Sequence, residues 1–254
     1  MNKQSIAVID SGIGGISVLK NLTQKFPTEH FIYFGDNDNA PYGNLSKLKL
    51  LQLAMRSIDF VKSYNVKAVV LACNTLSVNL FNEINEYSNI PTFCVFPPVE
   101  QCEVSGQKTL LLATDRTAKN YKTSKYLDVV GLKDLASIIE KNVLNLDRFD
   151  FNEYFNFVVK KNDLTSNYAN VILGCTHFNF IKNQIFVHFR PQNLCDGTEN
   201  LLINLQKFYK NDKSLDKYKR FYPLFIGKNG KLNEYIYNVS GQSISFWAKK
   251  LKKN

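Results

Sequence analysis

Two short apolar runs, each followed directly by a cysteine and small polar residues, constrain the fold of this chain more than any other feature. The first spans residues 69–75 (VVLACNT) and the second residues 171–177 (VILGCTH). Continuous β-branched and aliphatic runs of this length, flanked by helical patterns, are typical of buried parallel strands. In open α/β sheets, the residues just past the carboxyl end of a strand line the ligand crevice. If two similar units face each other, Cys73 and Cys175 can therefore approach one ligand from opposite sides.

Strand-like and helix-like segments alternate along the rest of the chain. Residues 129–139 fit either type of element. The alternation indicates an α/β fold with largely parallel sheets flanked by helices. Pro97-Pro98 is the most plausible crossing into a second unit. Apolar runs predict strands at 6–9, 30–34, 91–96, 109–113 and 222–226, and helical spacing predicts helices at 18–26, 46–64, 117–127, 143–160, 178–189, 201–208 and 244–251.

Size and composition exclude several classes of protein. The chain has 254 residues, 44% of them hydrophobic, which suits one large or two modest domains with real cores. No apolar run approaches the roughly 20 residues that cross a bilayer. The strand at 6–9 leaves no room for a signal peptide, so we expect a cytoplasmic protein with no membrane partner. Its five cysteines are scattered without a CxxC pair, which favours reduced thiols over a disulfide framework.

The net charge of +10 and the lysine-rich stretch at residues 249–253 leave two interpretations open. A basic patch suits nucleic acid or another acidic surface. Alternatively, the lysines belong to a solvated helix end, where cations are favourable. No nucleic-acid recognition motif accompanies the charge, so we do not expect nucleic acid as the partner. The charge can instead assist the capture of anionic substrates.

A glycine-rich turn follows the first predicted strand, at residues 10–17 (DSGIGGIS). Backbone N–H groups at a helix start attract carboxylate or phosphate, so this turn is a candidate anion-binding site. Its glycines miss the G-x-G-x-x-G spacing of dinucleotide-binding turns, and no Gly-Lys-Ser/Thr of a P-loop follows. Asp10 ends the strand where the crevice is expected, although a helix N-cap is a simpler role for it.

Four motifs stand in one order along the chain, namely Asp10-Ser11-Gly12, Pro41-Tyr42-Gly43, Ala72-Cys73-Asn74-Thr75 and Gly174-Cys175-Thr176-His177. In this order and spacing they resemble glutamate racemase, a cofactor-independent member of the aspartate/glutamate racemase superfamily, over residues 6 to 180. The resemblance implies two pseudo-symmetric α/β domains that enclose the substrate. We divide them as residues 1–97 with 208–254, and residues 98–207. It also implies a glutamate substrate, a homodimer, no cofactor, no metal, and a role in supplying D-glutamate for bacterial peptidoglycan.

The same resemblance implies roles for individual residues. Cys73 and Cys175 would be the two acid/base groups, while Asp10 and His177 would hold the substrate and tune the thiols. Glu140, in a segment similar to one of the family, would add a carboxylate near Cys175. The implied substrate-binding residues are Asp10, Ser11, Pro41, Tyr42, Gly43, Asn74, Thr75, Thr114, Thr117, Thr176 and His177.

The chemistry explains why such a site needs two thiols. Inverting an α-carbon requires removing a proton from one face and returning one to the other, which groups on opposite walls accomplish. The reference pKa of cysteine, about 8.5, can be lowered toward neutrality by a helix start and polar neighbours. Acid/base catalysis supplies about 10²- to 10⁴-fold, so the site must also stabilise the developing carbanionic carboxylate. Backbone N–H groups of residues 11–14 and the hydroxyls of Thr75, Thr117 and Thr176 are suitable donors.

Simpler roles stay open for the same residues. Either cysteine alone can be a small packing residue, and Cys73, Cys175 and His177 could form a three-ligand zinc site. Tyr42 can merely pack, and Glu140 can be a surface carboxylate. For the whole protein, the alternatives are a racemase of aspartate or of mixed specificity, and a catalytically silent amino-acid-binding protein of the same fold.

Overall fold

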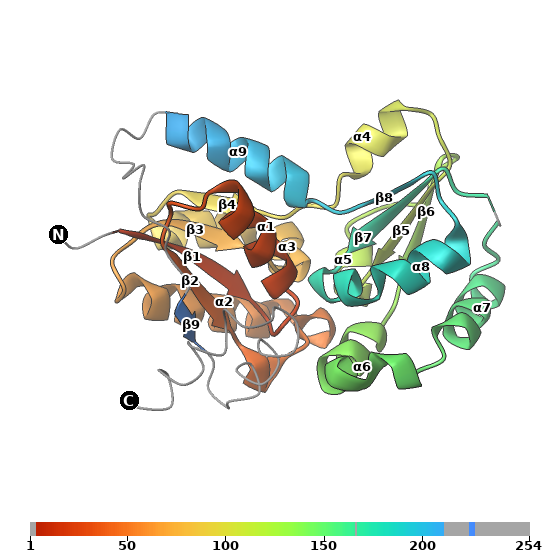
Figure 1. The fold of residues 1–254 in the computed structure, drawn as a ribbon, viewed down its shortest axis with the longest axis horizontal. Coiled ribbons are helices and arrows are strands. Elements are labelled where there is room, and N and C mark those ends of the chain that lie inside the picture. The colour runs from red at the N-terminus through yellow and green to blue at the C-terminus, as the bar shows by residue number, and fades with distance from the viewer. Residues whose placement is uncertain (1–3, 166, 211–223, 227–254) are drawn as a thin grey trace.

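Helices and strands alternate along the chain and build two separate sheets. The computed structural model describes residues 4–165, 167–210 and 224–226. Within these residues, every strand pair of both sheets is parallel. Figure 1 shows the two sheets side by side, each with helices packed against it. The predicted α/β fold with two open, helix-flanked sheets is confirmed.

The first unit is built on a sheet with the strand order β4-β3-β1-β2-β9. Its strands are β1 (Ser5–Asp10), β2 (Phe31–Gly35), β3 (Val66–Leu71), β4 (Thr92–Cys94) and β9 (Leu224–Ile226). The helices on it are α1 (Ile16–Lys25), α2 (Lys47–Lys62), α3 (Asn74–Ser88) and α9 (Thr198–Lys210), with short turns η1 (Asn37–Asn39) and η2 (Tyr42–Asn44) after β2. β9 falls within the strand predicted at 222–226, whereas the helix predicted at 244–251 lies outside the described residues.

The second unit is built on a sheet with the order β6-β5-β7-β8. Its strands are β5 (Thr109–Ala113), β6 (Leu127–Gly131), β7 (Asn170–Gly174) and β8 (Asn193–Cys195). Its helices and helical turns are α4 (Val99–Val104), α5 (Asp115–Ala118), α6 (Leu135–Asn142), η3 (Val143–Arg148), α7 (Phe151–Lys161), η4 (Thr176–Ile181) and α8 (Lys182–Phe189).

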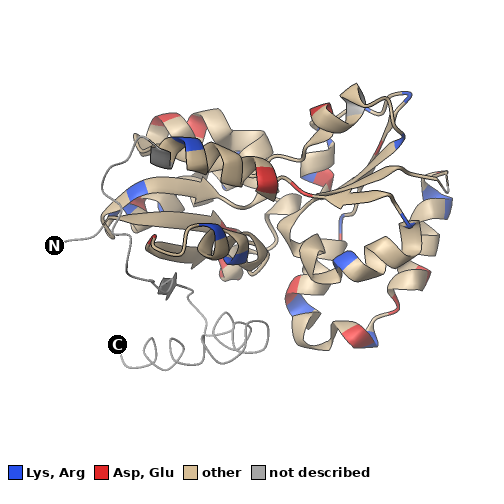
Figure 2. Cartoon of the chain, turned by 45° about the horizontal axis from the view of Figure 1, so that its top comes forward, with Lys and Arg blue, Asp and Glu red and all other residues tan. Residues whose placement is uncertain are grey.

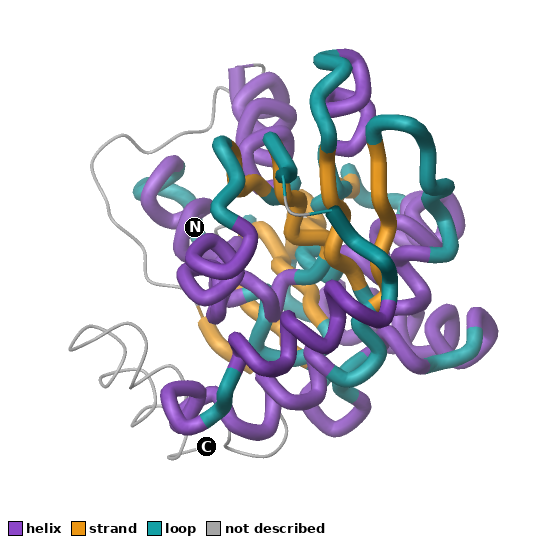
Figure 3. The backbone as a smooth tube through the Cα atoms, turned by 90° about the vertical axis from the view of Figure 1, so that its right-hand side faces the viewer, coloured by secondary structure: helices purple, strands orange, loops and turns teal. Residues whose placement is uncertain are grey.

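Both faces of each sheet are buried, which explains the continuous apolar runs in the sequence. Neighbouring residues of a strand point to opposite faces, so each face collects alternate side chains. In β1, Ile6 and Val8 join the core that includes α1 and α9, whereas Ala7 and Ile9 join the core that includes α2 and α3. Figure 3 shows the strands running inside a shell of helices.

The least accurate sequence prediction concerns residues 117–139. The predicted helix at 117–127 is wrong, because α5 ends at Ala118 and β6 begins at Leu127. The ambiguous stretch at 129–139 divides between β6 and α6. β6 is an edge strand that pairs with β5 from Leu127 to Gly131, and such pairing with a distant strand leaves no trace in local periodicity.

Helix α9 packs on the first unit. Its residues Leu201 and Leu205 are buried in the core that β1 and α1 also build. We therefore infer that the chain returns to the first unit near Gly197, ahead of the predicted division at residue 208.

The two segments that join the units pass each other in close contact. A Cβ atom on Gly197 would lie 3.0 Å from the backbone nitrogen of Phe96 and 2.8 Å from its carbonyl carbon. Because Phe96 precedes Pro97-Pro98, the outgoing and returning segments touch backbone to backbone. A glycine is required here, since any side chain would push the two segments apart.

Replacing Gly197 by alanine is expected to destabilise the protein. Overpacking against backbone should lower the free energy of unfolding by about 1–3 kcal/mol, measured by urea unfolding. Gly106 is the control, because it has a φ of +65° and a Cβ atom added to it would have nothing within 4 Å. Asparagine tolerates that conformation, so Gly106→Asn should stay close to wild type. Equal unfolding free energies for the two variants would contradict the proposed contact.

Lys and Arg residues, as well as Asp and Glu residues, occur along the backbone of both units (Figure 2). The lysine-rich stretch at 249–253 lies outside the described residues, so its role stays as predicted from sequence. Among the helices of the described ranges, none has the length and apolar character required to span a membrane.

Candidate active site

Strands of both sheets end at one small shared hollow. Residues that follow β1, β2 and β3 line it from the first unit, and residues that follow β5 and β7 line it from the second. The lining residues of the first unit are Ser11, Pro41, Tyr42, Gly43, Cys73, Asn74 and Thr75. Those of the second unit are Thr114, Ala136, Cys175, Thr176 and His177.

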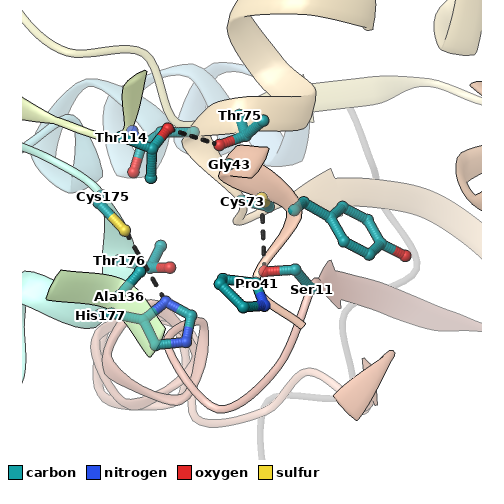
Figure 4. Close-up of a pocket in the computed structure, with 12 residues that line it drawn as sticks. Ser11, Pro41, Gly43, Cys73, Thr75, Thr114, Ala136, Cys175, Thr176 and His177 are labelled. Carbon is teal, nitrogen blue, oxygen red and sulfur yellow. Dashed lines mark hydrogen bonds between the residues drawn. The ribbon is translucent and has the colours of Figure 1, made fainter. Parts of the chain in front are cut away.

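The two cysteines lie on opposite walls of this hollow (Figure 4). Cys73 follows β3 and Cys175 follows β7, so the paired strands of the sequence bring their thiols to the same place. Both side chains are free thiols and nearly buried, with 4% of Cys73 and 6% of Cys175 exposed. Two free thiols therefore face one small space from different units.

The Cys73 thiol is held in its protonated form. Burial and the neighbouring Asp10 carboxyl raise the pKa of Cys73 to about 12. The backbone N–H of Leu76 and the Ser11 hydroxyl oppose this shift but do not cancel it. The thiol donates to Ser11 Oγ over 3.8 Å. The prediction that the start of α3 brings the pKa of Cys73 toward neutrality is therefore wrong, since burial outweighs the helix start.

Cys175 faces a different environment, because a histidine and a carboxylate stand in line behind it. Its Sγ lies 3.8 Å from His177 Nδ1, and His177 Nε2 lies 2.5 Å from Glu140 Oε2. Burial favours the neutral imidazole, but the hydrogen bonds to Cys175 and Glu140 outweigh it and hold the pKa of His177 well above its usual value. Burial alone would raise the pKa of Glu140, but His177, Ile13 and Asn37 lower it. Glu140 and His177 thus form an ion pair beside the Cys175 sulfur.

Glu140 is largely buried, so the alternative that it is a surface carboxylate is wrong. Only 14% of its side chain is exposed, and it reaches from α6 to the first unit.

Asp10 and Thr117 do not line the hollow but lie just behind residues that do. Asp10 contacts Thr176, and Thr117 contacts Thr114.

The glycine-rich turn binds carboxylates, but they belong to the protein itself. The backbone N–H of Gly12 donates to Asp10 Oδ1 over 2.9 Å, and that of Ile13 donates to Glu140 Oε2 over 3.1 Å. A Cβ atom on Gly12 would lie 2.8 Å from the Glu140 carboxyl carbon, so a side chain there would expel Glu140. These two N–H groups already donate within the protein, so of the turn predicted to bind substrate, the N–H groups of Ser11 and Gly14 stay predicted donors.

Asp10 also connects the two units, but it belongs to the first unit and contacts the second. Its Oδ2 accepts a hydrogen bond of 3.1 Å from the Thr176 hydroxyl. Burial raises the pKa of Asp10 above its ordinary value, although the cationic His177 and the Gly12 N–H pull it down. Asp10 is thus a fixed acceptor beneath the hollow, and it is also one of the groups that raise the pKa of Cys73.

Three threonine hydroxyls form a cluster across the units. Thr75 Oγ1 lies 3.1 Å from Thr114 Oγ1 and 3.3 Å from Thr117 Oγ1, and the latter two are 3.1 Å apart. Figure 4 shows the Thr75 and Thr114 hydroxyls meeting at one edge of the hollow. Each hydroxyl can rotate to donate to an anion, so the cluster suits a carboxylate.

The loop after β2 presents backbone to the hollow. Tyr42 lines it, yet the Tyr42 hydroxyl donates to Asp36 Oδ2 over 2.6 Å. Burial and this carboxylate raise the pKa of Tyr42, so the phenol is neutral and serves to hold the loop. Gly43 packs against Thr114, since a Cβ atom on it would lie 2.6 Å from the Thr114 Cβ. Asn74 is held by its own contact, from Nδ2 to the carbonyl of Val95 over 2.9 Å.

Sequence reasoning missed three residues around the hollow. Ala136 lines it from α6, and Asn37 and the Ile13 backbone hold Glu140. An alanine in a helix carries no chemical signal, and the glycine-rich turn predicts a donor at Ile13 without showing that Glu140 is its partner. Position 37 sits in the loop after β2, shortly before the Pro41-Tyr42-Gly43 motif, which was the one clue available.

The hollow suits proton transfer at one carbon atom. Thiols face it from opposite walls, an ion pair stands behind one of them, and hydroxyls at its edge suit a carboxylate. Within the described part of the chain, no three His, Cys, Asp or Glu side chains are grouped to hold a metal ion, so the zinc set considered from sequence is not assembled.

Known proteins resemble this chain over almost its whole length. It is 33% identical to the glutamate racemase of Clostridium acetobutylicum over 84% of each chain. It is 31% identical to that of Clostridium novyi over 94% of this chain and 96% of the relative. No protein-family model matches it.

Solved structures agree with the sequence relatives. A glutamate racemase isoform of Bacillus anthracis superposes with a TM-score of 0.78 over 94% of both chains at 21% identity, which supports the fold. The glutamate racemase of Francisella tularensis, solved with D-glutamate, superposes with a TM-score of 0.74 over 95% of this chain and 96% of that one at 25% identity. Identity above 30% across nearly complete chains, together with this fold, settles the family. The chain belongs to the glutamate racemase family.

Proposed function

We propose that the protein interconverts L- and D-glutamate without a cofactor, by proton transfer to and from Cys73 and Cys175. The observation that carries this proposal is the pair of free thiols on opposite walls of one buried hollow. Family membership supports glutamate as the substrate.

The reaction balances with the two thiols alone. One cysteine, as thiolate, takes the α-proton and becomes a thiol, leaving a carbanionic carboxylate. The opposite cysteine, as thiol, gives its proton to the other face of the α-carbon and becomes a thiolate. The cysteines exchange their protonation states in each turnover, and the enantiomer of opposite handedness restores them.

The unequal surroundings of the two thiols support an ordered starting state. Cys73, with a pKa of about 12, begins as the proton donor. The His177 imidazolium lies beside Cys175, so a positive charge faces the second thiol and not the first. His177 can hold this charge because Glu140 compensates it.

The developing carbanion requires stabilisation beyond that supplied by the thiols. The threonine cluster formed by Thr75, Thr114 and Thr117 supplies preorganised hydroxyl donors at one edge of the hollow. Because nearly all of the lining is buried, each donor acts in a medium with little water, where it contributes most.

Replacing Thr75 by valine is expected to raise KM for glutamate by about 10- to 100-fold, since a hydrogen bond to a charged group is worth about 1.5–3 kcal/mol. Steady-state kinetics with both enantiomers measure this. Thr23→Val is the matched control, because Thr23 lies on α1 and its hydroxyl bonds the Lys20 carbonyl away from the hollow. An unchanged KM in Thr75→Val would remove the threonine cluster from substrate binding.

The cellular role follows from the reaction proposed. D-glutamate produced in the cytoplasm would supply peptidoglycan synthesis, and the active species would be a homodimer, as the family resemblance implies. Analytical ultracentrifugation of the purified chain tests the dimer.

A circular-dichroism assay across amino acids tests the substrate. We expect loss of optical rotation with either enantiomer of glutamate and no comparable change with aspartate. Comparable rates with aspartate would establish a mixed specificity. If glutamate binds but its optical signal does not change, the protein is a catalytically silent amino-acid-binding protein and not a racemase.

A further inference from the structure

The Glu140 carboxylate is held by three donors, and two of them come from the other unit. His177 Nε2 lies 2.5 Å from Oε2 within the second unit. From the first unit, the Ile13 N–H donates to Oε2 over 3.1 Å and Asn37 Nδ2 donates to Oε1 over 2.9 Å. The Ile13 donor is a backbone N–H, which a substitution does not remove. Of the two donors from the first unit, only that of Asn37 belongs to a side chain.

The Asn37 amide has one orientation that fits. With Nδ2 toward Glu140 it donates to a carboxylate oxygen, whereas a flipped amide would set two acceptors against each other. In the adopted orientation the buried Oδ1 finds no donor among the described residues. Leaving a buried acceptor unpaired is unfavourable, so the contact of Nδ2 with Glu140 determines how this side chain is placed.

Substrate entry must interrupt these contacts. The lining residues are almost completely buried, with 3% of Thr176 and 1% of His177 exposed, so glutamate can enter only when the units separate. Separation takes Asn37 and Ile13 away from Glu140 while His177 stays with it on the second unit. Glu140 then keeps one of its three donors, and closure returns the other two.

We propose that Asn37 is a positioning residue that couples closure of the two units to the charge of His177. Through His177, closure then affects proton transfer at Cys175. The coupling passes from the Asn37 amide to Glu140 and from Glu140 to the imidazole. The inference rests on the proposed function for its catalytic consequence, but not for the coupling itself.

The groups that face this chain of contacts are few. Cys175 and Glu140 face His177, and the Asp10 carboxyl acts on it through space. His177 and Asp10 are the charged groups that act on Glu140. None of them is altered by a change at position 37, so a shift in the titration of His177 reports the lost donor.

NMR titration of the histidine imidazoles tests the coupling without any substrate. The chain has three histidines, so His30→Gln and His188→Gln identify the His177 signal. In Asn37→Ala, Glu140 loses a donor to its charged form and holds the imidazolium less well. We expect His177 to titrate at lower pH than in the wild type.

Asn44→Ala is the matched control. Asn44 lies in the same loop and also donates across the units, from Nδ2 to the Lys133 carbonyl over 3.4 Å. Its removal weakens contact between the units without touching Glu140, so the His177 titration should match the wild type. A His177 titration that is unchanged in Asn37→Ala, or shifted equally in Asn44→Ala, would overturn the coupling.

Kinetics supply the second readout. Asn37→Ala should lower kcat by about 10-fold, the loss expected for one hydrogen bond to a charged group, and change KM by less than about 3-fold. In Asn37→Asp the introduced carboxyl group can donate to Glu140 while protonated, and repels it once ionised. The activity of Asn37→Asp relative to wild type should therefore fall as pH rises, a dependence that a merely structural role would not produce. A relative activity independent of pH would contradict the role of the donor.

The two readouts separate this inference from the proposed function. If wild-type protein racemises no amino acid, the proposed function fails, while the NMR comparison still decides the coupling. If wild-type protein racemises glutamate and the three proteins titrate alike, the coupling alone fails.

Discussion

Replacing either Cys73 or Cys175 by alanine is expected to abolish racemisation of glutamate. Each variant lacks one of the two proton carriers, so the α-carbon can be approached from one face only. We expect kcat/KM to fall by at least the roughly 10²- to 10⁴-fold that acid/base catalysis supplies. Because L- and D-glutamate have equal free energies, the loss must be the same in both directions.

Cys94→Ala is the matched control for these two variants. Cys94 ends β4 as a free, half-buried thiol, and it does not line the hollow. It should retain wild-type turnover, which a polarimetric assay of all three variants measures. Substantial turnover by Cys73→Ala or Cys175→Ala would contradict transfer by two bases.

His177 provides the second large effect. Replacing it by glutamine keeps a donor for Glu140 but removes the positive charge beside Cys175, so kcat should fall by about 10²-fold or more. His188→Gln is the control, since His188 packs on the aromatic residues of α7 and α8. A kcat in His177→Gln near that of the control would show that the imidazolium is not needed.

The shifted pKa values of His177 and Glu140 also fix how stability depends on pH. Because the pKa of His177 is raised on folding, the imidazolium stabilises the fold fully below its ordinary pKa, and this is lost as pH rises through the raised value. Because the pKa of Glu140 is lowered, the carboxylate stabilises the fold above its ordinary pKa, and this is lost as pH falls through the lowered value. The ion pair therefore stabilises the fold most strongly between the ordinary pKa values of glutamate and histidine. In thermal melts, His177→Gln should be less stable than wild type in this window.

The sequence was sufficient to predict those strands whose residues form a continuous apolar run. The runs before Cys73 and Cys175 are continuous because both faces of β3 and β7 are buried, and that alone predicts parallel strands that end at a crevice. The sequence could not predict β6, because the segment before it has a misleading helical spacing and its pairing with β5 is not a local feature.

Long-range contacts explain what was missed at the site. The glycine-rich turn has the shape of an anion site, but only the fold reveals that Glu140, 127 residues from Ile13, supplies the anion. Burial depends on every packed neighbour, so the raised pKa of Cys73 could not be foreseen from the helix that follows it. The contact of Asn37 with Glu140 could not be foreseen, because the two residues lie 103 positions apart in different units.

Incorporation of deuterium at the α-carbon tests the central proposal most directly. Wild-type protein is incubated in D₂O with L-glutamate or with D-glutamate, and both enantiomers are recovered early in the reaction and analysed by mass spectrometry. We expect the newly formed enantiomer to carry deuterium in both incubations, because its proton comes from the thiol opposite the one that took the first. Inverted glutamate without deuterium, or deuterium that enters the starting enantiomer as early as the inverted one, would contradict proton transfer by Cys73 and Cys175.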